Sequence, residues 1–230
     1  MRKQQHVWQQ EHQSEQALPG LGEQEPSSGV VEFVKFLKQN GVSQGKAIDI
    51  GCGKGRNSVY LAQQGFLVEA LDYIQGALDA AQQLAETKSC ANKINFVQAA
   101  IDSPWPYGDN TFDIAVDCFS SIDIETLEGR RTYHDEMLRT LKPGGYALVT
   151  VVSADDEWES NQEITKPGPE PNSVTWLQNG KFQKNYDEAE LREFYKDFEI
   201  VELEKISKPA FKMGRQGMAT NFWVVLKKRA

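Results

Sequence analysis

The chain has 230 residues, 40% of them hydrophobic, and a formal net charge of −8. This length and apolar content suit one domain with a single core, and no apolar run approaches the ~20 residues that a membrane-spanning helix needs. The acidic balance argues against general nucleic-acid binding, which depends on neutralising phosphates with Lys and Arg.

Residues 1–29 are polar and rich in glutamine, without the apolar stretch of a secretory signal. We expect a flexible arm or lid here, followed by a single domain over residues 30–230. That domain begins with an amphipathic helix from Val30 to Asn40, because Val30, Phe33, Val34 and Leu37 share one helical face.

A glycine loop follows the first predicted strand. The strand ends in Asp49 and Ile50, and Gly51, Gly53 and Gly55 then alternate with other residues before a helix that begins near Asn57. Glycines in this position let the backbone turn sharply and let a ligand approach it closely. The spacing matches neither the G-x-G-x-x-G loop of dinucleotide sites nor the G-x-x-x-x-G-K-[ST] loop that grips phosphates. A carboxylate before the loop suits a ligand that carries an ammonium group.

The second predicted strand, residues 67–72, ends in Asp72, which lies 17 residues after Gly55. An acidic residue near this distance binds ribose hydroxyls in α/β nucleotide folds. The alternative is a charge that interacts with the N-terminus of the next predicted helix, Ile74 to Lys88.

Two further strands and a helix-to-strand joint follow the glycine loop and Asp72 in the sequence. A strand over residues 94–98 precedes Ala99-Ala-Ile101-Asp102-Ser-Pro-Trp, and a strand over residues 114–119 contains Asp117. A helix ending in Arg-Thr-Leu-Lys-Pro143-Gly-Gly145 then leads into a fifth strand, because proline stops the helix and the glycines turn the chain.

These four motifs, in this order over residues 46–152, resemble those of class I S-adenosylmethionine-dependent methyltransferases. Residues 47–72 are most similar to the branch that contains tellurite-resistance and thiopurine- or thiol-type enzymes. The resemblance implies S-adenosylmethionine as cofactor, with Asp72 on the ribose, Ile101 against the adenine ring and Asp102 accepting from its amino group. Ala99 departs from the family pattern, in which this position is often acidic. The full set of implied cofactor-binding residues is Asp49, Gly51, Cys52, Gly53, Gly55, Asn57, Asp72, Tyr73, Ile101, Asp102, Asp117 and Phe119.

The alternation of strands and helices predicts a doubly wound α/β fold with a mostly parallel sheet. By resemblance, this Rossmann-like sheet has seven strands in the order 3-2-1-4-5-7-6, with an antiparallel last strand. After a helix over residues 187–196, the last two strands are expected at residues 198–206 and 220–228. Residues 155–185 interrupt the alternation, and we interpret them as an insertion on the substrate side. Tryptophans in the arm and in this insertion (Trp8, Trp158, Trp176) suit a lid that excludes water.

The implied reaction is an in-line displacement in which the protein mainly aligns the reactants. A general base matters only for an acceptor that keeps its proton near neutral pH. Asp117 is the best-placed candidate, although no catalytic residue can be assigned. His134 is expected on a helix surface, and His6 and His12 lie in the arm, from which they could fold over the site.

The chain lacks the Asn/Asp-Pro-Pro-Tyr/Phe motif of amino-methylating nucleic-acid enzymes after the fourth strand. This favours a small-molecule acceptor, methylated on sulfur, oxygen or an inorganic oxyanion. Two alternatives remain open. Residues 205–230 carry seven basic residues and no acidic one, so this segment could dock a protein or RNA substrate. The chain could also bind the cofactor without catalysis.

Cys52, Cys90 and Cys118 show no metal-ligand spacing and no evident disulfide pattern. We therefore expect no metal site, no membrane association and a reducing, cytoplasmic location. The sequence specifies neither the acceptor nor the oligomeric state.

Overall fold

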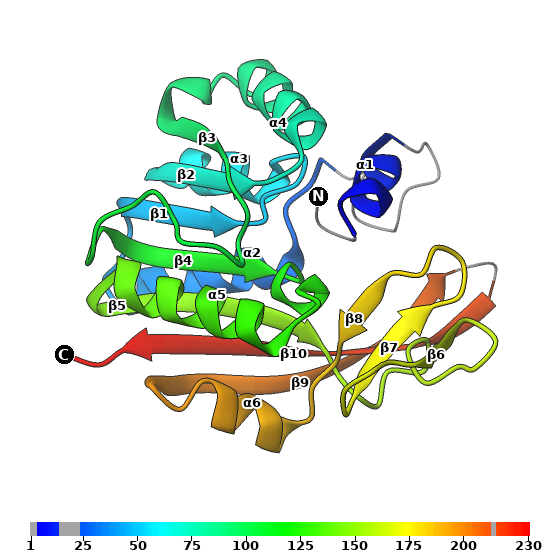
Figure 1. Ribbon diagram of the computed structural model, residues 1–230. Coiled ribbons are helices and arrows are strands. Elements are labelled where there is room, and N and C mark those ends of the chain that lie inside the picture. The colour runs from blue at the N-terminus through cyan, green and yellow to red at the C-terminus, as the bar shows by residue number, and fades with distance from the viewer. Residues whose placement is uncertain (1–3, 14–23, 213–214) are drawn as a thin grey trace.

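The computed structural model describes residues 4–13, 24–212 and 215–230. Its centre is a seven-stranded sheet in the order β3-β2-β1-β4-β5-β10-β9 (Figure 1). The strands are β1 Gly45–Ile50, β2 Phe66–Asp72, β3 Ile94–Gln98, β4 Phe112–Cys118, β5 Leu141–Val152, β9 Phe198–Lys212 and β10 Arg215–Lys228. The first five are parallel, and β10 runs antiparallel to both β5 and β9. The predicted strand order and the antiparallel last strand are confirmed.

Helices cover both faces of this sheet. They are α2 Ser28–Gln39, α3 Arg56–Gln63, α4 Gln75–Thr87, α5 Leu127–Thr140 and α6 Glu188–Phe194, with short 3₁₀ helices η1 Ala91–Lys93 and η2 Ser121–Asp123. Successive strand residues face opposite sides, so Ala47 packs with α2, α3 and α4, whereas Ile48 and Ile50 pack with α5 and α6. Two apolar cores result, one on each face.

The helix boundaries follow local capping chemistry. At α6 the Asp187 side chain accepts from the Glu190 backbone N–H while the Glu190 side chain accepts from the Asp187 N–H, a complete capping box. At α5 the Thr126 hydroxyl accepts from the Gly129 N–H. Both caps lie on the face of the sheet where Ile48 and Ile50 pack with α5 and α6.

Residues 165–184 form a small antiparallel sheet that the sequence analysis does not predict. Its strands are β6 Thr165–Pro167, β7 Ser173–Trp176 and β8 Phe182–Lys184. Trp158, Ile164 and Trp176 make a separate apolar cluster against Ala219 of β10. This small sheet therefore lies beside the distal half of the β9–β10 hairpin (Figure 1).

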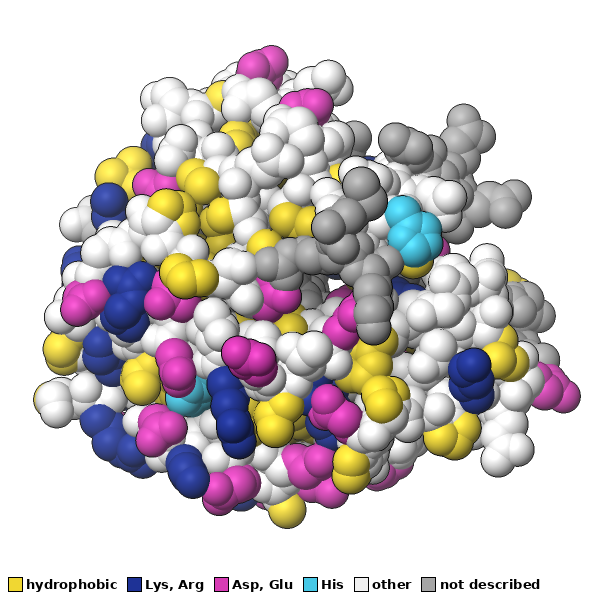
Figure 2. Space-filling view, in the orientation of Figure 1, with side chains coloured by type: hydrophobic (Ala, Val, Ile, Leu, Met, Phe, Trp, Pro, Cys, Tyr) yellow, Lys and Arg dark blue, Asp and Glu magenta, His cyan; other side chains and the backbone are white. Residues whose placement is uncertain are grey.

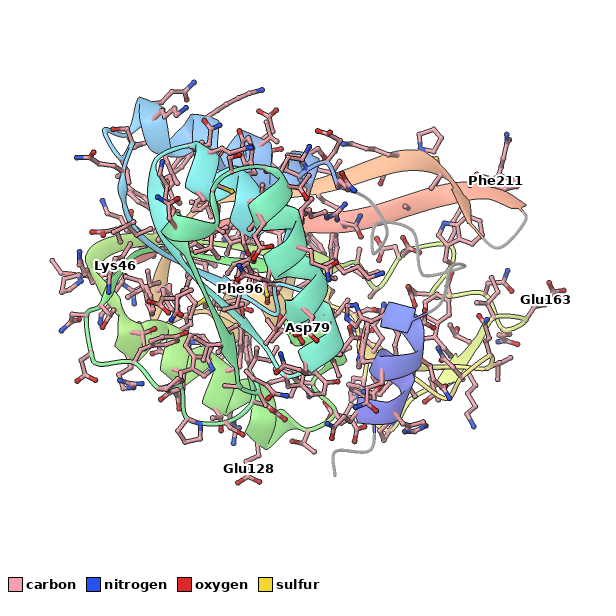
Figure 3. The ribbon with its side chains drawn as sticks, turned by 90° about the horizontal axis from the view of Figure 1, so that it is seen from above. Lys46, Asp79, Phe96, Glu128, Glu163 and Phe211 are labelled. Atoms are coloured by element: carbon pink, nitrogen blue, oxygen red, sulfur yellow. The ribbon has the colours of Figure 1, made fainter. Side chains whose placement is uncertain are left out.

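The predicted arm contains a helix, α1 Gln5–Gln13, whereas residues 1–3 and 14–23 lie outside the described residues. In a view from above, α1 lies beside α4 and next to the small sheet (Figure 3). The division into an arm over residues 1–29, a domain over residues 30–230 and a substrate-side insertion over residues 155–185 stays a prediction.

His134 differs from its predicted position on the surface of α5. Its ring is only 5% exposed and packs among Phe194, Tyr195 and Phe198. The prediction was wrong because α6 and the start of β9, which come later in the chain, cover this face of α5.

Charged side chains are mixed on the face shown in Figure 2, where Lys and Arg alternate with Asp and Glu over α5 and α6. In the basic C-terminal segment, Lys205 is paired with Asp155. Within the described ranges, no group of three or more His, Cys, Asp and Glu side chains is arranged to hold a metal ion. None of the helices described is long and apolar enough to cross a membrane.

Candidate active site

A cavity of about 570 Å³ lies beyond the carboxyl ends of β1, β2, β4 and β5. Open parallel sheets bind ligands at this edge. One wall of the cavity comes from the glycine loop and the loops after β2, β3 and β4. The opposite wall comes from α1, from the loop before β8 and from β10. The cavity therefore joins segments from both ends of the chain.

The three loop glycines all have positive φ: Gly51 +68°, Gly53 +53° and Gly55 +81°. A Cβ on Gly51 would overlap the Ser120 side chain, and a Cβ on Gly55 would lie 2.7 Å from the Cβ of Ala81 in α4. Gly51 and Gly53 line the cavity, whereas Gly55 does not. The first two glycines shape the cavity, and the third lets α3 pack against α4.

Asp72 closes β2 and lines the cavity. Its Oδ2 accepts from the Gly53 N–H at 2.9 Å, and its Oδ1 accepts from the Ile74 N–H at 2.9 Å, at the start of α4. Burial raises the pKa of this carboxyl, against the opposing effect of these hydrogen bonds. Asp72 thus fills the helix-terminus role that the sequence analysis kept as an alternative, while it also faces the cavity.

Asp49 lies behind the glycine loop and does not line the cavity. Its Oδ2 accepts from the Ser58 hydroxyl at 2.5 Å, and burial raises its pKa to about 6. Asn57 lines the cavity and its Oδ1 accepts from the Ser27 N–H at 3.0 Å, which joins the start of α2 to α3. Both residues hold the loop in place through buried polar contacts.

Residues after β2 and β3 form the next part of the wall. Tyr73, Ile101 and Asp102 all line the cavity, and the Trp105 indole N–H donates to the Ile101 carbonyl at 3.0 Å. Cys52 lines it as well, and burial raises the pKa of its thiol. This end of the cavity is therefore apolar, with the carboxylates of Asp72 and Asp102 at its edge.

At the end of β4 and in the loop after it, one predicted site residue lines the cavity and another is buried behind it. Phe119 lines the cavity with φ +65°, a backbone conformation that costs free energy in a non-glycine residue. Asp117 lies fully buried behind it, where its carboxylate accepts from the Ser120 N–H at 2.8 Å and from the Tyr133 hydroxyl at 2.7 Å. The structure does not bring the Asp117 carboxylate to the cavity.

The residues predicted from the sequence thus divide into two groups. Nine line one cavity, and Asp49, Gly55 and Asp117 support it from behind. The nine are Gly51, Cys52, Gly53, Asn57, Asp72, Tyr73, Ile101, Asp102 and Phe119.

The opposite wall contains residues that sequence reasoning missed or only suspected. The Gln4 amide donates to the Asp123 carbonyl at 3.0 Å and accepts from the Phe182 N–H at 2.9 Å. The Lys181 ammonium lies 4.8 Å from the Trp8 ring centre and 5.6 Å from the Trp176 ring centre. The sequence signals for this wall were the tryptophans and His12, because the other contacts join residues far apart in the chain.

His12 reaches the glycine loop from α1. Its Cε1 lies 3.6 Å from the point where a Gly53 Cβ would be, and its Nδ1 has no hydrogen-bond partner within the described residues. Burial lowers the pKa of His12, while the nearby Asp72 carboxylate raises it. This position agrees with the expectation from the sequence that His12 could fold over the site.

Residues 47–145 match a family model described as a methyltransferase domain. Ubiquinone biosynthesis O-methyltransferase from Rickettsia typhi is 28% identical over 54% of this chain and 47% of its own length. The probable S-adenosyl-L-methionine-dependent methyltransferase TehB from Haemophilus influenzae is 29% identical over 70% of this chain and 48% of its own length. The chain thus spans about half the length of these two curated relatives.

Solved structures share the fold. A crystal structure of a SAM-dependent methyltransferase from Methanosarcina mazei superposes with a TM-score of 0.69 at 21% identity. The match covers 84% of this chain and 97% of that one. The likeness extends well beyond residues 47–145, so the fold is shared over most of the chain.

Proposed function

We propose that this chain transfers the methyl group of S-adenosylmethionine to a small molecule held in the cavity. Residues 47–145 match a model of a methyltransferase domain, and a relative of 29% identity is named a probable S-adenosyl-L-methionine-dependent methyltransferase. The acceptor atom is sulfur, oxygen or an inorganic oxyanion. The observation that carries the proposal is one continuous cavity, which joins the glycine loop and Asp72 to the wall built by α1 and the small sheet.

The residues present suit this cofactor. The glycines expose backbone where a ligand can lie close to it, and Asp72 and Asp102 both line the cavity. Carboxylates accept strong hydrogen bonds from hydroxyl and amino groups, and Ile101 offers an apolar surface beside them. We assign the ribose to Asp72 and the adenine to Ile101 and Asp102.

The cofactor supplies a methyl group that is already activated as a sulfonium. The chain's own residues then have to orient the acceptor and exclude water, and orientation of this kind contributes up to ~7–11 kcal/mol. Phe119 and the tryptophans of the opposite wall provide an apolar enclosure for that step. A volume of about 570 Å³ lies within the range of small-molecule sites.

The names of the relatives support a small acceptor. One relative acts in ubiquinone biosynthesis as an O-methyltransferase, and another is named TehB. These names describe those proteins, and their matches cover 54% and 70% of this chain.

The experiment is to supply S-adenosylmethionine labelled on its methyl group together with thiols, phenols and tellurite, each alone, and to follow the label. We expect label in one class of small product. Cofactor binding without transfer to any of these would favour a non-catalytic role. Transfer only to protein or RNA extracts would favour docking through residues 205–230.

A further inference from the structure

Asp123 and Lys181 form a loose ion pair inside the cavity. Asp123 ends η2, and Lys181 lies just before β8. Their Oδ1 and Nζ atoms are 3.5 Å apart, longer than the 2.7–2.9 Å of a tight charge-assisted hydrogen bond. Asp123 Oδ1 has no hydrogen-bond partner among the described residues. A buried carboxylate oxygen normally has one, so the Asp123 carboxylate, whose side chain is 11% exposed, keeps an unused capacity to accept a hydrogen bond.

The surroundings fix the ammonium in position. The Lys181 side chain is 5% exposed, and it lies against the faces of both Trp8 and Trp176. Indole faces attract a cation without accepting its hydrogen bonds as an oxygen does. The ammonium therefore keeps N–H donors that can point to a ligand oxygen in the cavity.

The sheet order places this pair on the other side of β1 from Asp72. Asp72, Ile101 and Asp102 follow β2 and β3, on one side of β1. Asp123 follows the Phe119 loop after β4, and the wall beyond it comes from β10 and the small sheet. The pair thus lies beside the wall of the cavity that β10 and the small sheet form.

We propose that Asp123 is the catalytic base of the methyl transfer, that Lys181 stabilises the acceptor oxyanion, and that the acceptor presents a hydroxyl group of the phenol or enol class. This inference rests on the proposed function and names the substrate class of the same site. It moves the role of base from Asp117, whose carboxylate is fully engaged behind the cavity, to Asp123, a residue that lines it.

The step balances in charge and atoms. The acceptor O–H proton passes to the Asp123 carboxylate while the oxygen lone pair forms a bond to the methyl carbon. The carbon–sulfur bond breaks and its electron pair stays on sulfur, which leaves as a neutral thioether. Lys181 donates N–H to the acceptor oxygen while that oxygen carries negative charge, and it remains protonated throughout.

The charge environment suits a base that works near neutral pH. Burial raises the pKa of Asp123 to about 6, with Lys181 opposing this rise and Asp117 adding to it. The other charged or titratable residues that line the cavity are His12, Cys52, Lys54, Arg56, Asp72, Tyr73, Asp102, Cys118, Glu125 and Glu159. Transfer to a hydroxyl should therefore increase as the pH rises through about 6, because the base must be ionised.

The test uses two probe acceptors, 4-methylphenol and the more acidic 4-nitrophenol, with the full chain and S-adenosylmethionine. In Asp123→Asn we expect methylation of 4-methylphenol to fall by roughly 10²–10⁴-fold. Methylation of 4-nitrophenol should fall far less, because this phenol is already ionised at about pH 8. The rise of the rate near pH 6 should also disappear.

A second variant tests the oxyanion role. The absorbance of bound 4-nitrophenolate, measured with S-adenosylhomocysteine present, should show a lower phenol pKa in wild type than in Lys181→Met. Glu128→Gln, which changes an exposed carboxylate at the start of α5 (Figure 3), serves as the control and should match wild type in both assays.

The outcomes separate this inference from the proposed function. Unchanged binding of S-adenosylmethionine to Asp123→Asn, with selective loss of 4-methylphenol turnover, supports it. Equal losses for both phenols, wild-type rates in Asp123→Asn, or methylation of amines or thiols but of neither phenol would overturn it and leave the proposed function standing. A wild-type chain that fails to bind S-adenosylmethionine would contradict both.

Discussion

The Asp72 carboxylate accepts a hydrogen bond from the backbone N–H of Gly53 at 2.9 Å and thereby ties the end of β2 to the glycine loop after β1. The two residues come from neighbouring parallel strands, whose carboxyl ends meet at one edge. The same carboxylate holds the first turn of α4 through Ile74. One side chain therefore fixes the loop and the helix between which a ligand would lie.

Gly51→Ala should lower both stability and cofactor affinity. Its positive φ and its contact with Ser120 leave no room for a Cβ, and strain of this kind costs of the order of 1–3 kcal/mol. Denaturant unfolding and calorimetric titration with S-adenosylmethionine measure the two effects. Gly144→Ala is the matched control, because Gly144 also has positive φ but would place its Cβ with nothing within 4 Å. An equal loss of affinity in both variants would contradict the role given to Gly51.

Gln4→Ala should loosen α1 from the rest of the molecule. The substitution removes the hydrogen bonds to the Asp123 carbonyl and from the Phe182 N–H, each worth about 0.5–1.5 kcal/mol. Hydrogen exchange of the α1 amides should become faster, while exchange in β1 and β4 stays unchanged. Gln10→Ala, at an exposed position of the same helix, controls for helix propensity. Slow exchange that persists in Gln4→Ala would show that other contacts hold α1.

Asp49→Asn should change the pH dependence of stability. Burial raises the Asp49 pKa from 3.8 to about 6, so between these values the native state binds more protons than the unfolded state. The free energy of unfolding of wild type therefore loses a contribution of roughly 3 kcal/mol as the pH rises through this window. The asparagine variant lacks that loss, and its stability relative to wild type should increase from about pH 4 to about pH 6.

Unfolding by urea at several pH values measures this difference. Asp79→Asn, at an exposed position of α4 (Figure 3), controls for the removal of one negative charge. A difference between Asp49→Asn and wild type that stays constant with pH would mean that the Asp49 carboxyl titrates as it does in the unfolded chain.

Short sequence motifs made the central sheet predictable. The strand order was implied by the family resemblance, which rested on motifs such as the alternating glycines after Ile50 and the Pro143-Gly-Gly joint, and the structure has that order. The last two strands are longer than predicted, extending to Lys212 and starting at Arg215. Pairing across the hairpin supports residues that looked like loop, including Pro209, which lies on the edge strand.

Long-range contacts explain what could not be predicted. The strands β6 and β8 have three residues each, too short for a periodic pattern. Helix α1 is stabilised by Gln4 and Trp8, whose partners lie near residues 123 and 181. The Asp123–Lys181 pair itself joins two loops with no shared motif. Such pairs arise only when the folded chain brings separate segments together, so a single sequence contains no sign of them.

The most direct test of the central claim is calorimetric titration of the chain with S-adenosylmethionine and, separately, with NAD, using wild type, Asp72→Ala and the exposed control Asp79→Ala. We predict that wild type and Asp79→Ala bind S-adenosylmethionine but not NAD. Asp72→Ala should bind it about 10- to 100-fold more weakly, as expected for the loss of charge-assisted hydrogen bonds worth about 1.5–3 kcal/mol. Binding of NAD in place of S-adenosylmethionine, or wild-type affinity in an Asp72→Ala variant that remains folded, would contradict the assignment of this cavity.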